Sequence, residues 1–341
     1  MMKQQIMIEP GKIEFREIPI PKLEEDEVLI KIMRIGVCGS DIHVFHGKHP
    51  YTSYPVTQGH EVSGVIDKVG NNITNLKPGD KVTIQPQVVC GKCHSCLHGN
   101  YHICDELKVM GFQTTGMASE FFVTEASRVL KLPEEMSYEQ GAMIEPMAVA
   151  CGVFKKTDEL NGLKVVVLGA GPIGNLTAQT AKALGAKTVL ITDVSDFRLE
   201  IAKEVGIDYT INPLRQDLSE EIVKAFGPDR ADLIIECVGI NQTIDDAITN
   251  ARKGTDIILV GVFGDKPKVD LGTVQDRELR IIGMLMYQTK EYLKAIELVH
   301  SGKVQLEPLM TKHFNFEDYN KAYQFIEENN DKSMKVFIDV N

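Results

Sequence analysis

The chain has 341 residues, of which 43% are hydrophobic and 25% are charged, and its formal net charge is −11. This composition is typical of a soluble globular protein that is long enough for two domains. The acidic balance argues against binding to nucleic acid, no apolar run reaches the roughly 18 residues that span a membrane, and residues 1–22 lack the apolar core of a signal peptide. We therefore expect a cytoplasmic protein whose seven cysteines are metal ligands or buried thiols rather than disulfides.

The first part of the chain has the residue pattern of β-strands. Between Gln5 and Val37 apolar residues recur at every second position, and Pro10-Gly11 interrupts them as a turn. Residues 61–69 and 81–85 predict two further strands. Short strands separated by turns favour a small all-β barrel or sandwich.

The segment from Val37 to Glu61 carries residues suited to a catalytic metal. Cys38, His60 and Glu61 offer a thiolate, an imidazole and a carboxylate, which zinc accepts while one position stays open for water or substrate. Ser40 and His43 follow the cysteine closely enough to pass a proton. Taken alone, Cys38 could be a small buried residue and His60 a core histidine; the motifs that follow favour the metal site.

A second metal site is predicted in a lobe spanning about residues 88–106. Four cysteines occur there with the spacing of a zinc ribbon: Cys90, Cys93, Cys96 and Cys104. Four thiolates fill the tetrahedral sphere of zinc, so this site is structural rather than catalytic. We expect the interleaved histidines to be solvated or to lie beside the ligands without binding: His94, His98 and His102.

Residues 137–150 predict a helix that contains Glu145 among apolar neighbours. A carboxylate buried there without a partner would be costly, and a nearby cation would remove the cost. Alternatively, Glu145 is exposed at the helix end.

The residue pattern changes at Gly162, where strands buried on both faces begin. Residues 164–168 form a continuous apolar run, a helix is expected at 176–184, and a second buried strand at 188–192 ends at Asp193. The turn between the first strand and the helix is the glycine motif Gly169, Ala170, Gly171, Pro172, Ile173 and Gly174. Its glycines allow a tight turn, close approach of a pyrophosphate and packing of the helix on the strand.

Asp193 is placed to discriminate between cofactors. A carboxylate about twenty residues after the glycines accepts hydrogen bonds from the adenosine ribose and repels a 2′-phosphate, which predicts NAD rather than NADP. Arg198 is close enough to contact the adenine end, or is simply a solvated charge on a helix.

The alternation of strands and helices then continues. Strands are expected at 209–211, 232–237, 256–260 and 279–284, with helices at 218–226 and 243–253, so six strands make one doubly wound parallel sheet. Two strand-end glycine loops are candidates for the ligand crevice, or are ordinary turns: Val238-Gly239 and Gly261-Val262-Phe263-Gly264. A helix at 291–300 and a final strand at 335–340 follow, and this strand is expected to return to the first domain.

Together these motifs resemble the zinc-dependent medium-chain dehydrogenase/reductase superfamily along the whole chain. The resemblance implies an α/β protein with a GroES-like β-rich catalytic domain and a Rossmann cofactor domain, with the active site in the cleft between them. The expected divisions are 1–152 for the catalytic domain, 153–289 for the NAD-binding domain and 290–341 for the segment that returns to the catalytic domain. A homo-oligomer, either a dimer or a tetramer, is expected.

The resemblance also implies roles for the site residues. Two zinc ions per chain are expected, and either Glu61 or Glu145 completes the catalytic set, where ethanol dehydrogenases carry a cysteine in place of Glu145. Ser40 would accept the substrate proton, His43 would relay it to solvent through the cofactor ribose, and the hydride would pass to NAD⁺. A non-enzymatic redox sensor that retained both kinds of site is the competing class.

Three stretches carry a finer resemblance within the superfamily: Pro50-Tyr51-Thr52-Ser53-Tyr54-Pro55, Met110-Gly111-Phe112 and Ile144-Glu145-Pro146. They most resemble bacterial hexonate dehydrogenases, which oxidise galactonate or gulonate to the 5-keto acid. Polyol dehydrogenases usually carry an arginine before the tyrosine that follows the last cofactor-domain strand, whereas here Met286 precedes Tyr287. Polyol and L-threonine dehydrogenases are the alternatives. Lys48 and Tyr287 are the candidate residues for binding a small polyhydroxylated substrate.

Overall fold

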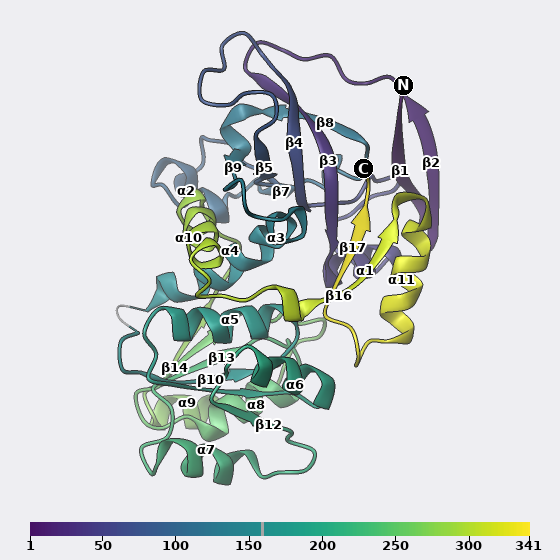
Figure 1. Cartoon of the computed structure of the whole chain (residues 1–341). Helices are drawn as coiled ribbons and strands as arrows, with labels where there is room; N and C mark the ends of the chain where they lie inside the picture. The colour runs from purple at the N-terminus through teal and green to yellow at the C-terminus, as the bar shows by residue number, and fades with distance from the viewer. Residues whose placement is uncertain (158–159) are drawn as a thin grey trace. The chain divides into compact units, whose positions relative to one another are not determined.

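The computed structural model describes residues 1–157 and 160–341, which form two compact units (Figure 1). The first unit combines Met1–Glu145 with Met310–Asn341, and the second is Pro146–Leu309. Residues 310–341 therefore belong to the first unit, whereas residues 290–309 belong to the second. The domain boundaries expected from the sequence, after residues 152 and 289, stay predictions.

The first unit is built on a seven-stranded mixed sheet. In order across the sheet the strands are β16 (Met310–Asn315), β17 (Lys335–Asp339), β3 (Glu27–Val37), β4 (Glu61–Val69), β5 (Lys81–Ile84) and β9 (Val129–Lys131), and β8 (Phe121–Glu125) also pairs with β3. A separate hairpin of β1 (Met2–Glu9) and β2 (Lys12–Ile18) turns at Gly11, whose φ of 78° suits glycine.

Strand β3 shows how the alternation seen in the sequence becomes a core. Ile30, Ile32 and Ile35 are all fully buried, although Ile32 and Ile35 are an odd number of positions apart. The pairing of β3 with β4 shifts register between Ile32 and Arg34, and such a bulge reverses the side-chain alternation. The bulge therefore lets the same face of the sheet stay apolar up to the end of the strand.

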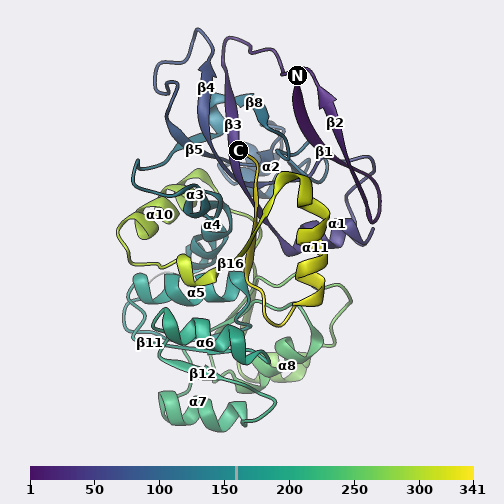
Figure 2. The ribbon, with the colours of Figure 1, turned by 45° about the vertical axis from the view of Figure 1, so that its right-hand side comes forward.

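The C-terminal strand β17 lies inside this sheet rather than at its edge. It runs parallel to β16 and antiparallel to β3, with Val336 opposite Val37. Helix α11 (Tyr319–Glu328) precedes it and packs on β16 and β17, as the two ribbon views show (Figures 1 and 2). Tyr319 and Tyr323 form the buried face of α11.

The other helices of the first unit are short. They are α1 (Gly39–Phe45), α2 (His94–Leu97) and α3 (Tyr138–Ala142), and α4 (Ile144–Val153) continues into the second unit. Strands β6 (Gln87–Val88) and β7 (Lys108–Val109) pair at the base of the cysteine lobe. Single 3-10 turns occur at Tyr101–Ile103, Ala126–Arg128, Phe154–Lys156, Glu307–Leu309 and Phe316–Asp318.

The second unit is a six-stranded sheet in which every pair of neighbours is parallel. Across the sheet the strands are β12 (Tyr209–Ile211), β11 (Thr188–Thr192), β10 (Lys164–Leu168), β13 (Leu233–Glu236), β14 (Asp256–Leu259) and β15 (Arg280–Gly283). The helices are α5 (Pro172–Ala183), α6 (Asp196–Glu204), α7 (Leu218–Phe226), α8 (Asn241–Asn250), α9 (Leu271–Asp276) and α10 (Thr289–His300). This strand order is that of a doubly wound dinucleotide-binding sheet, so the expected fold class is confirmed.

The glycine motif forms the turn between β10 and α5. Gly169 has a φ of 99°, which an L-residue with a side chain rarely adopts. A Cβ on Gly174 would overlap the carbonyl oxygen of Gly169, so glycine is required where the helix meets the turn. Pro172 occupies the first turn of α5, where its missing N–H costs nothing.

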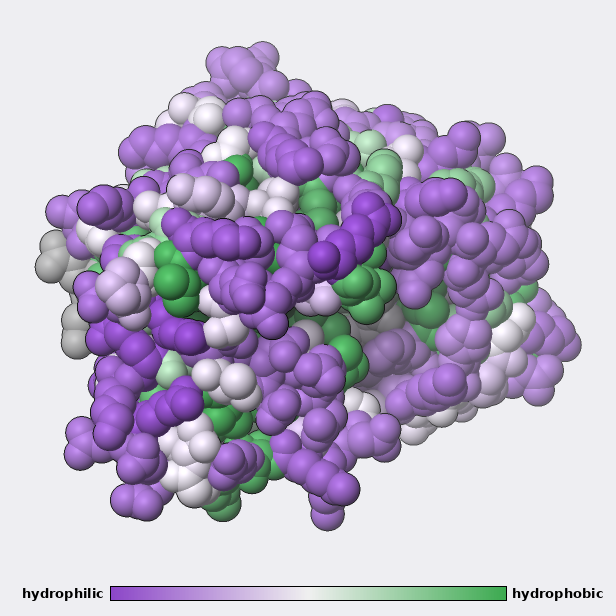
Figure 3. All heavy atoms as spheres, turned by 90° about the horizontal axis from the view of Figure 1, so that it is seen from below, coloured by the Kyte–Doolittle hydropathy of each residue, from purple (hydrophilic) through white to green (hydrophobic). Residues whose placement is uncertain are grey.

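Five helices lie outside the sequence prediction: α1, α2, α6, α9 and α11. Each is short or strongly polar on one side, and α6 starts where the Ser195 hydroxyl accepts a hydrogen bond from the Arg198 N–H, a capping contact that the apolar pattern does not reveal. The face seen in Figure 3 is mostly hydrophilic, with small apolar patches between polar side chains. Within the described ranges, no helix is both long and apolar enough to cross a membrane.

Candidate functional site

The first unit brings Cys38, His60 and Glu61 together. Cys38 follows β3 and is the N-cap of helix α1. His60 directly precedes the neighbouring strand β4, and Glu61 is the first residue of that strand and pairs with Gly36. One ligand atom from each of the three residues lies within 4.8 Å of the other two. His60 and Glu61 are buried and Cys38 is half-buried. A thiolate, an imidazole and a carboxylate this close together fit a zinc ion with an open position.

The buried Asp41 side chain contacts both Cys38 and His60. Its Oδ2 accepts a hydrogen bond of 2.9 Å from the Cys38 N–H, and its Oδ1 lies 3.5 Å from His60 Nδ1. Burial lowers the pKa of His60, but Asp41 and Cys38 outweigh burial and raise that pKa well above its usual value. A carboxylate behind a metal-binding histidine orients the ring and makes it a better ligand.

A buried ion pair flanks Glu61. The ammonium of Lys335, from strand β17, lies 2.5 Å from Glu61 Oε2, and the two side chains are only 3% and 2% exposed. Burial lowers the pKa of Lys335, but the negative charges of Glu61, Cys38 and Glu145 together leave it raised. A Cβ on Gly36 would overlap Glu61 Oε2, so glycine leaves the space that the pair occupies.

Glu145 is buried in the first turn of α4 and is not exposed at the helix end. The Glu145 carboxylate helps to raise the pKa of Lys335, so the positive charge of this buried lysine offsets part of the cost of burying Glu145. Glu145 does not join the set of ligand atoms that Cys38, His60 and Glu61 form.

The proton-relay candidates lie on helix α1. Ser40 is half-buried and His43 is exposed, and three residues apart on a helix they share one face. Within the described parts of the chain, no hydrogen bond joins their side chains directly.

An aromatic contact links the loop after α1 to the cluster. The ring of His49 stacks on Phe112 at 4.6 Å, and Phe112 lies 4.8 Å from the ring of His60. Burial, followed by the nearby His43, lowers the pKa of His49, which keeps its ring neutral at pH 7. His46 is paired with Glu327 of α11 at 2.5 Å. Lys48 is exposed, and its ammonium makes no ion pair with a described residue.

The four cysteines of the lobe also meet. Each thiol sulfur lies within 4.8 Å of the other three. Backbone N–H groups donate hydrogen bonds to the sulfur atoms; the Cys93 N–H, for example, lies 3.3 Å from Cys90 Sγ. Backbone hydrogen bonds from Asp105 and Cys96 lower the pKa of the Cys93 thiol to about 6. Such a set fits a closed tetrahedral zinc site. None of His94, His98 and His102 joins it, and His102 is buried.

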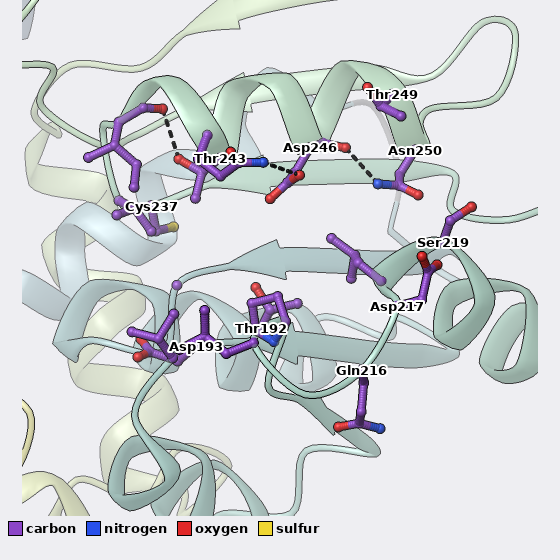
Figure 4. Close-up of a pocket in the computed structure, with 18 of the residues that line it drawn as sticks. Thr192, Asp193, Gln216, Asp217, Ser219, Cys237, Thr243, Asp246, Thr249 and Asn250 are labelled. Carbon is purple, nitrogen blue, oxygen red and sulfur yellow. Dashed lines mark hydrogen bonds between the residues drawn. The ribbon is translucent and has the colours of Figure 1, made fainter.

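The second unit has a cavity of about 740 Å³ at the carboxyl ends of β10, β11 and β13 (Figure 4). Asp193 lies at the end of β11, where Oδ2 accepts a hydrogen bond from the Ala170 N–H and Oδ1 accepts one from the Ser195 N–H. Arg198 Nη1 is 3.7 Å from Asp193 Oδ2. This ties the carboxylate to the glycine turn, the place where a dinucleotide ribose binds.

Comparison with known proteins agrees with this geometry. The family model of the alcohol dehydrogenase GroES-like domain matches residues 24–134, and that of the zinc-binding dehydrogenases matches residues 172–301. The chain is a zinc-dependent medium-chain dehydrogenase. Zinc and a nicotinamide dinucleotide are the cofactors typical of these enzymes, and membership favours an enzyme over a non-enzymatic redox sensor.

Its relatives fall in the polyol and sugar-acid branch of the superfamily. The chain is 34% identical to 2-dehydro-3-deoxy-L-galactonate 5-dehydrogenase of Pseudoalteromonas atlantica, over 92% of each chain. It is 35% identical to sorbitol dehydrogenase 2 of Saccharomyces cerevisiae, over 92% of this chain and 91% of the relative. An Escherichia coli protein described as a short chain alcohol dehydrogenase, solved with NADH, is 31% identical and superposes with a TM-score of 0.92 over 99% of both chains.

The cavity of this dehydrogenase includes only some of the residues expected to bind the cofactor. Gly169, Gly171, Asp193, Arg198 and Val238 line it, whereas Pro172, Ile173, Gly174, Gly239, Val262 and Phe263 do not. Gly174 and Gly239 instead allow close backbone packing, since a Cβ on either would overlap neighbouring backbone atoms. Tyr287 is fully buried and makes an edge contact with Tyr292, and Met286 before it has a φ of 49°.

Sequence reasoning missed five residues that lie in or beside the candidate sites of the dehydrogenase. Asp41 stands three residues after Cys38, a spacing typical of a helix-capping carboxylate. Lys335 is the first residue of a strand that was expected, but its partner is 274 positions away. Asp246 and the apolar residues Leu214 and Ile240 also line the cavity, and no sequence motif marks them.

The ion pair of Glu61 and Lys335 predicts a specific stability effect. Lys335→Met leaves the Glu61 carboxylate buried without its cation, and breaking a buried pair in this way costs about 3–5 kcal/mol. Urea unfolding followed by circular dichroism should therefore show a clearly lower midpoint. The double variant Glu61→Gln/Lys335→Met should recover part of the loss, because no charge is then left alone.

Lys332→Met is the matched control, because Lys332 is exposed in the same segment. It should change the free energy of unfolding by less than about 0.5 kcal/mol. Similar midpoints for the two single variants would contradict a stabilising role for the pair.

Proposed function

We propose that this dehydrogenase uses zinc and NAD⁺ to oxidise a secondary alcohol of a sugar acid, a hexonate, to the keto acid. The observation that carries the proposal is the buried cluster of Cys38, His60 and Glu61, because its donor set suits a metal that binds an alcohol oxygen. The cavity beside Asp193 in the second unit supports NAD as the hydride acceptor.

The residues of the cluster fit zinc, and each has a role. Cys38 and His60 would hold the ion together with Glu61 or Glu145, and the position of Glu61 within the cluster supports Glu61. Bound zinc supplies a Lewis acid that lowers the pKa of the alcohol hydroxyl. Ser40 accepts the hydroxyl proton, and His43, exposed on the same face of α1, passes it to solvent. Asp41 keeps the His60 ring oriented.

A sugar acid is supported by the positive charge of Lys48 and by the name of one relative. In the loop after α1, His46 is engaged by Glu327 and His49 is neutral, which leaves the Lys48 ammonium to meet a carboxylate. A relative acts, by its name, on a 2-dehydro-3-deoxy-L-galactonate. Other relatives named for sorbitol and L-threonine keep polyol and threonine oxidation as the second candidates.

Two further expectations belong to the proposal. A homo-oligomer, dimer or tetramer, and a cytoplasmic location are both consistent with this enzyme class and stay predictions. Tyr287 remains a candidate for substrate binding, on the condition that the segment around it opens, because its side chain is fully buried.

Metal content separates the two zinc sites. Purified protein should contain two zinc ions per chain by inductively coupled plasma mass spectrometry. Cys93→Ser should lose one ion and lower the thermal stability, because the lobe then has an incomplete tetrahedral site. Cys38→Ser should lose the other ion and all turnover while the fold survives. An active wild-type enzyme with a single zinc, bound at Cys38, would rule out the structural site.

Cofactor choice tests the role of Asp193. Asp193→Ser removes the carboxylate that meets the ribose 2′-hydroxyl, so the Michaelis constant for NAD⁺ should rise roughly tenfold to a hundredfold. The ratio of kcat/KM for NAD⁺ to that for NADP⁺ is the deciding quantity, since a merely loosened turn would weaken both cofactors alike. A wild type that already prefers NADP⁺ contradicts this role.

Substrate choice tests the hexonate. An NADH-absorbance screen over hexonates, hexitols, pentitols and L-threonine should show the highest kcat/KM for a hexonate. Lys48→Met should lower hexonate oxidation roughly tenfold to a hundredfold through loss of a charge-assisted hydrogen bond and leave hexitol oxidation nearly unchanged. Equal effects on both substrates, or none, would remove Lys48 from substrate selection.

A further inference from the structure

The cavity of the second unit extends well past Asp193. It continues between helix α8 and the loop 213–219, and Asp246 projects into this part from α8 (Figure 4). The neighbouring Asp245 is exposed on the same helix and does not line the cavity. The two adjacent carboxylates therefore differ in where they point.

Among the polar side chains that line the cavity are several apolar ones that the fold itself leaves uncovered. Leu214 is 77% exposed and Ile240 is 50% exposed, and Val194 and Val238 beside them are also exposed. Exposed apolar side chains that converge on one cavity are typical of a site for a flat, apolar-faced ligand. A purine ring has this shape.

The carboxylate of Asp246 is only partly satisfied. Gln242 Nε2 donates a hydrogen bond of 2.9 Å to Oδ1, and among the described residues no other donor or cation reaches the carboxylate. Burial raises the pKa of Asp246, as does Asp245, and the Gln242 amide opposes them. Oδ2 is therefore an acceptor for which a ligand can supply the donor.

We propose that Asp246 recognises the exocyclic amino group of adenine and makes the dehydrogenase selective for an adenine base. This rests on the proposed use of NAD. The adenine amino group donates hydrogen bonds, whereas hypoxanthine carries an oxygen acceptor at the same ring position, which a carboxylate repels. Two carboxylates of the cavity would then recognise adenosine: Asp193 at the ribose and Asp246 at the base.

The test compares NADH with its deaminated analogue, nicotinamide hypoxanthine dinucleotide in the reduced form. Dissociation constants are measured by nicotinamide fluorescence with the zinc-loaded enzyme. Wild type should bind the analogue roughly tenfold more weakly, the loss expected for one half-exposed charge-assisted hydrogen bond. Asp246→Asn offers both a donor and an acceptor, so its ratio of the two constants should fall to about 1.

Asp245→Asn is the matched control, since it removes the same charge from the same helix outside the cavity, and its ratio should stay at the wild-type value. Equal affinities of wild type for the two dinucleotides overturn the proposal, as does a ratio that Asp245→Asn and Asp246→Asn change alike. The two dissociation constants of the wild-type enzyme test the proposed selectivity for adenine even if a variant fails to fold. Failure of the proposed function would look different. The wild-type enzyme would then bind neither dinucleotide, or none of the tested alcohols would support its reduction of NAD⁺.

Discussion

A buried lysine and a buried glutamate, joined beside a thiol and an imidazole, are the constraint on which the first unit depends. Removing two charges from water is costly, and their mutual attraction repays it only when the geometry is held closely. Two strand registers provide that geometry: Gly36 opposite Glu61 between β3 and β4, and Val336 opposite Val37 between β17 and β3. A slip of one residue in either pairing would turn a charged side chain to the other face of the sheet.

The parts of the fold that sequence predicted are those with strong local patterns. Continuous apolar runs matched β10 and β11 residue for residue, and alternation matched β4. Helix α11 was missed because its apolar positions read as isolated aromatics in a tail, although Tyr319 and Tyr323 are four apart on one face. Tertiary packing, not local propensity, makes that segment a helix.

The candidate metal ligands could be recognised from the sequence because Cys38, His60 and the four lobe cysteines have diagnostic spacing, and the structure brings each set together. Lys335 could not be recognised in this way, because its function comes from a pairing that sequence spacing does not encode. The apolar walls of the cavity were hidden for a related reason. Leu214 and Ile240 lie in segments with little periodicity, and only the crossing of the loop after β12 with helix α8 brings them together. Their exposure, unusual for such residues, became informative only in three dimensions.

The split of the first unit between the two ends of the chain has a consequence for biosynthesis. The ribosome completes residues 146–309 before it makes β17, so the second unit can fold while the first still lacks a strand from the middle of its sheet. Until Lys335 emerges, Glu61 has no ammonium beside it. If Cys38, His60 and Glu61 hold zinc as proposed, they would capture it late, and the nascent cysteine lobe could load its ion first.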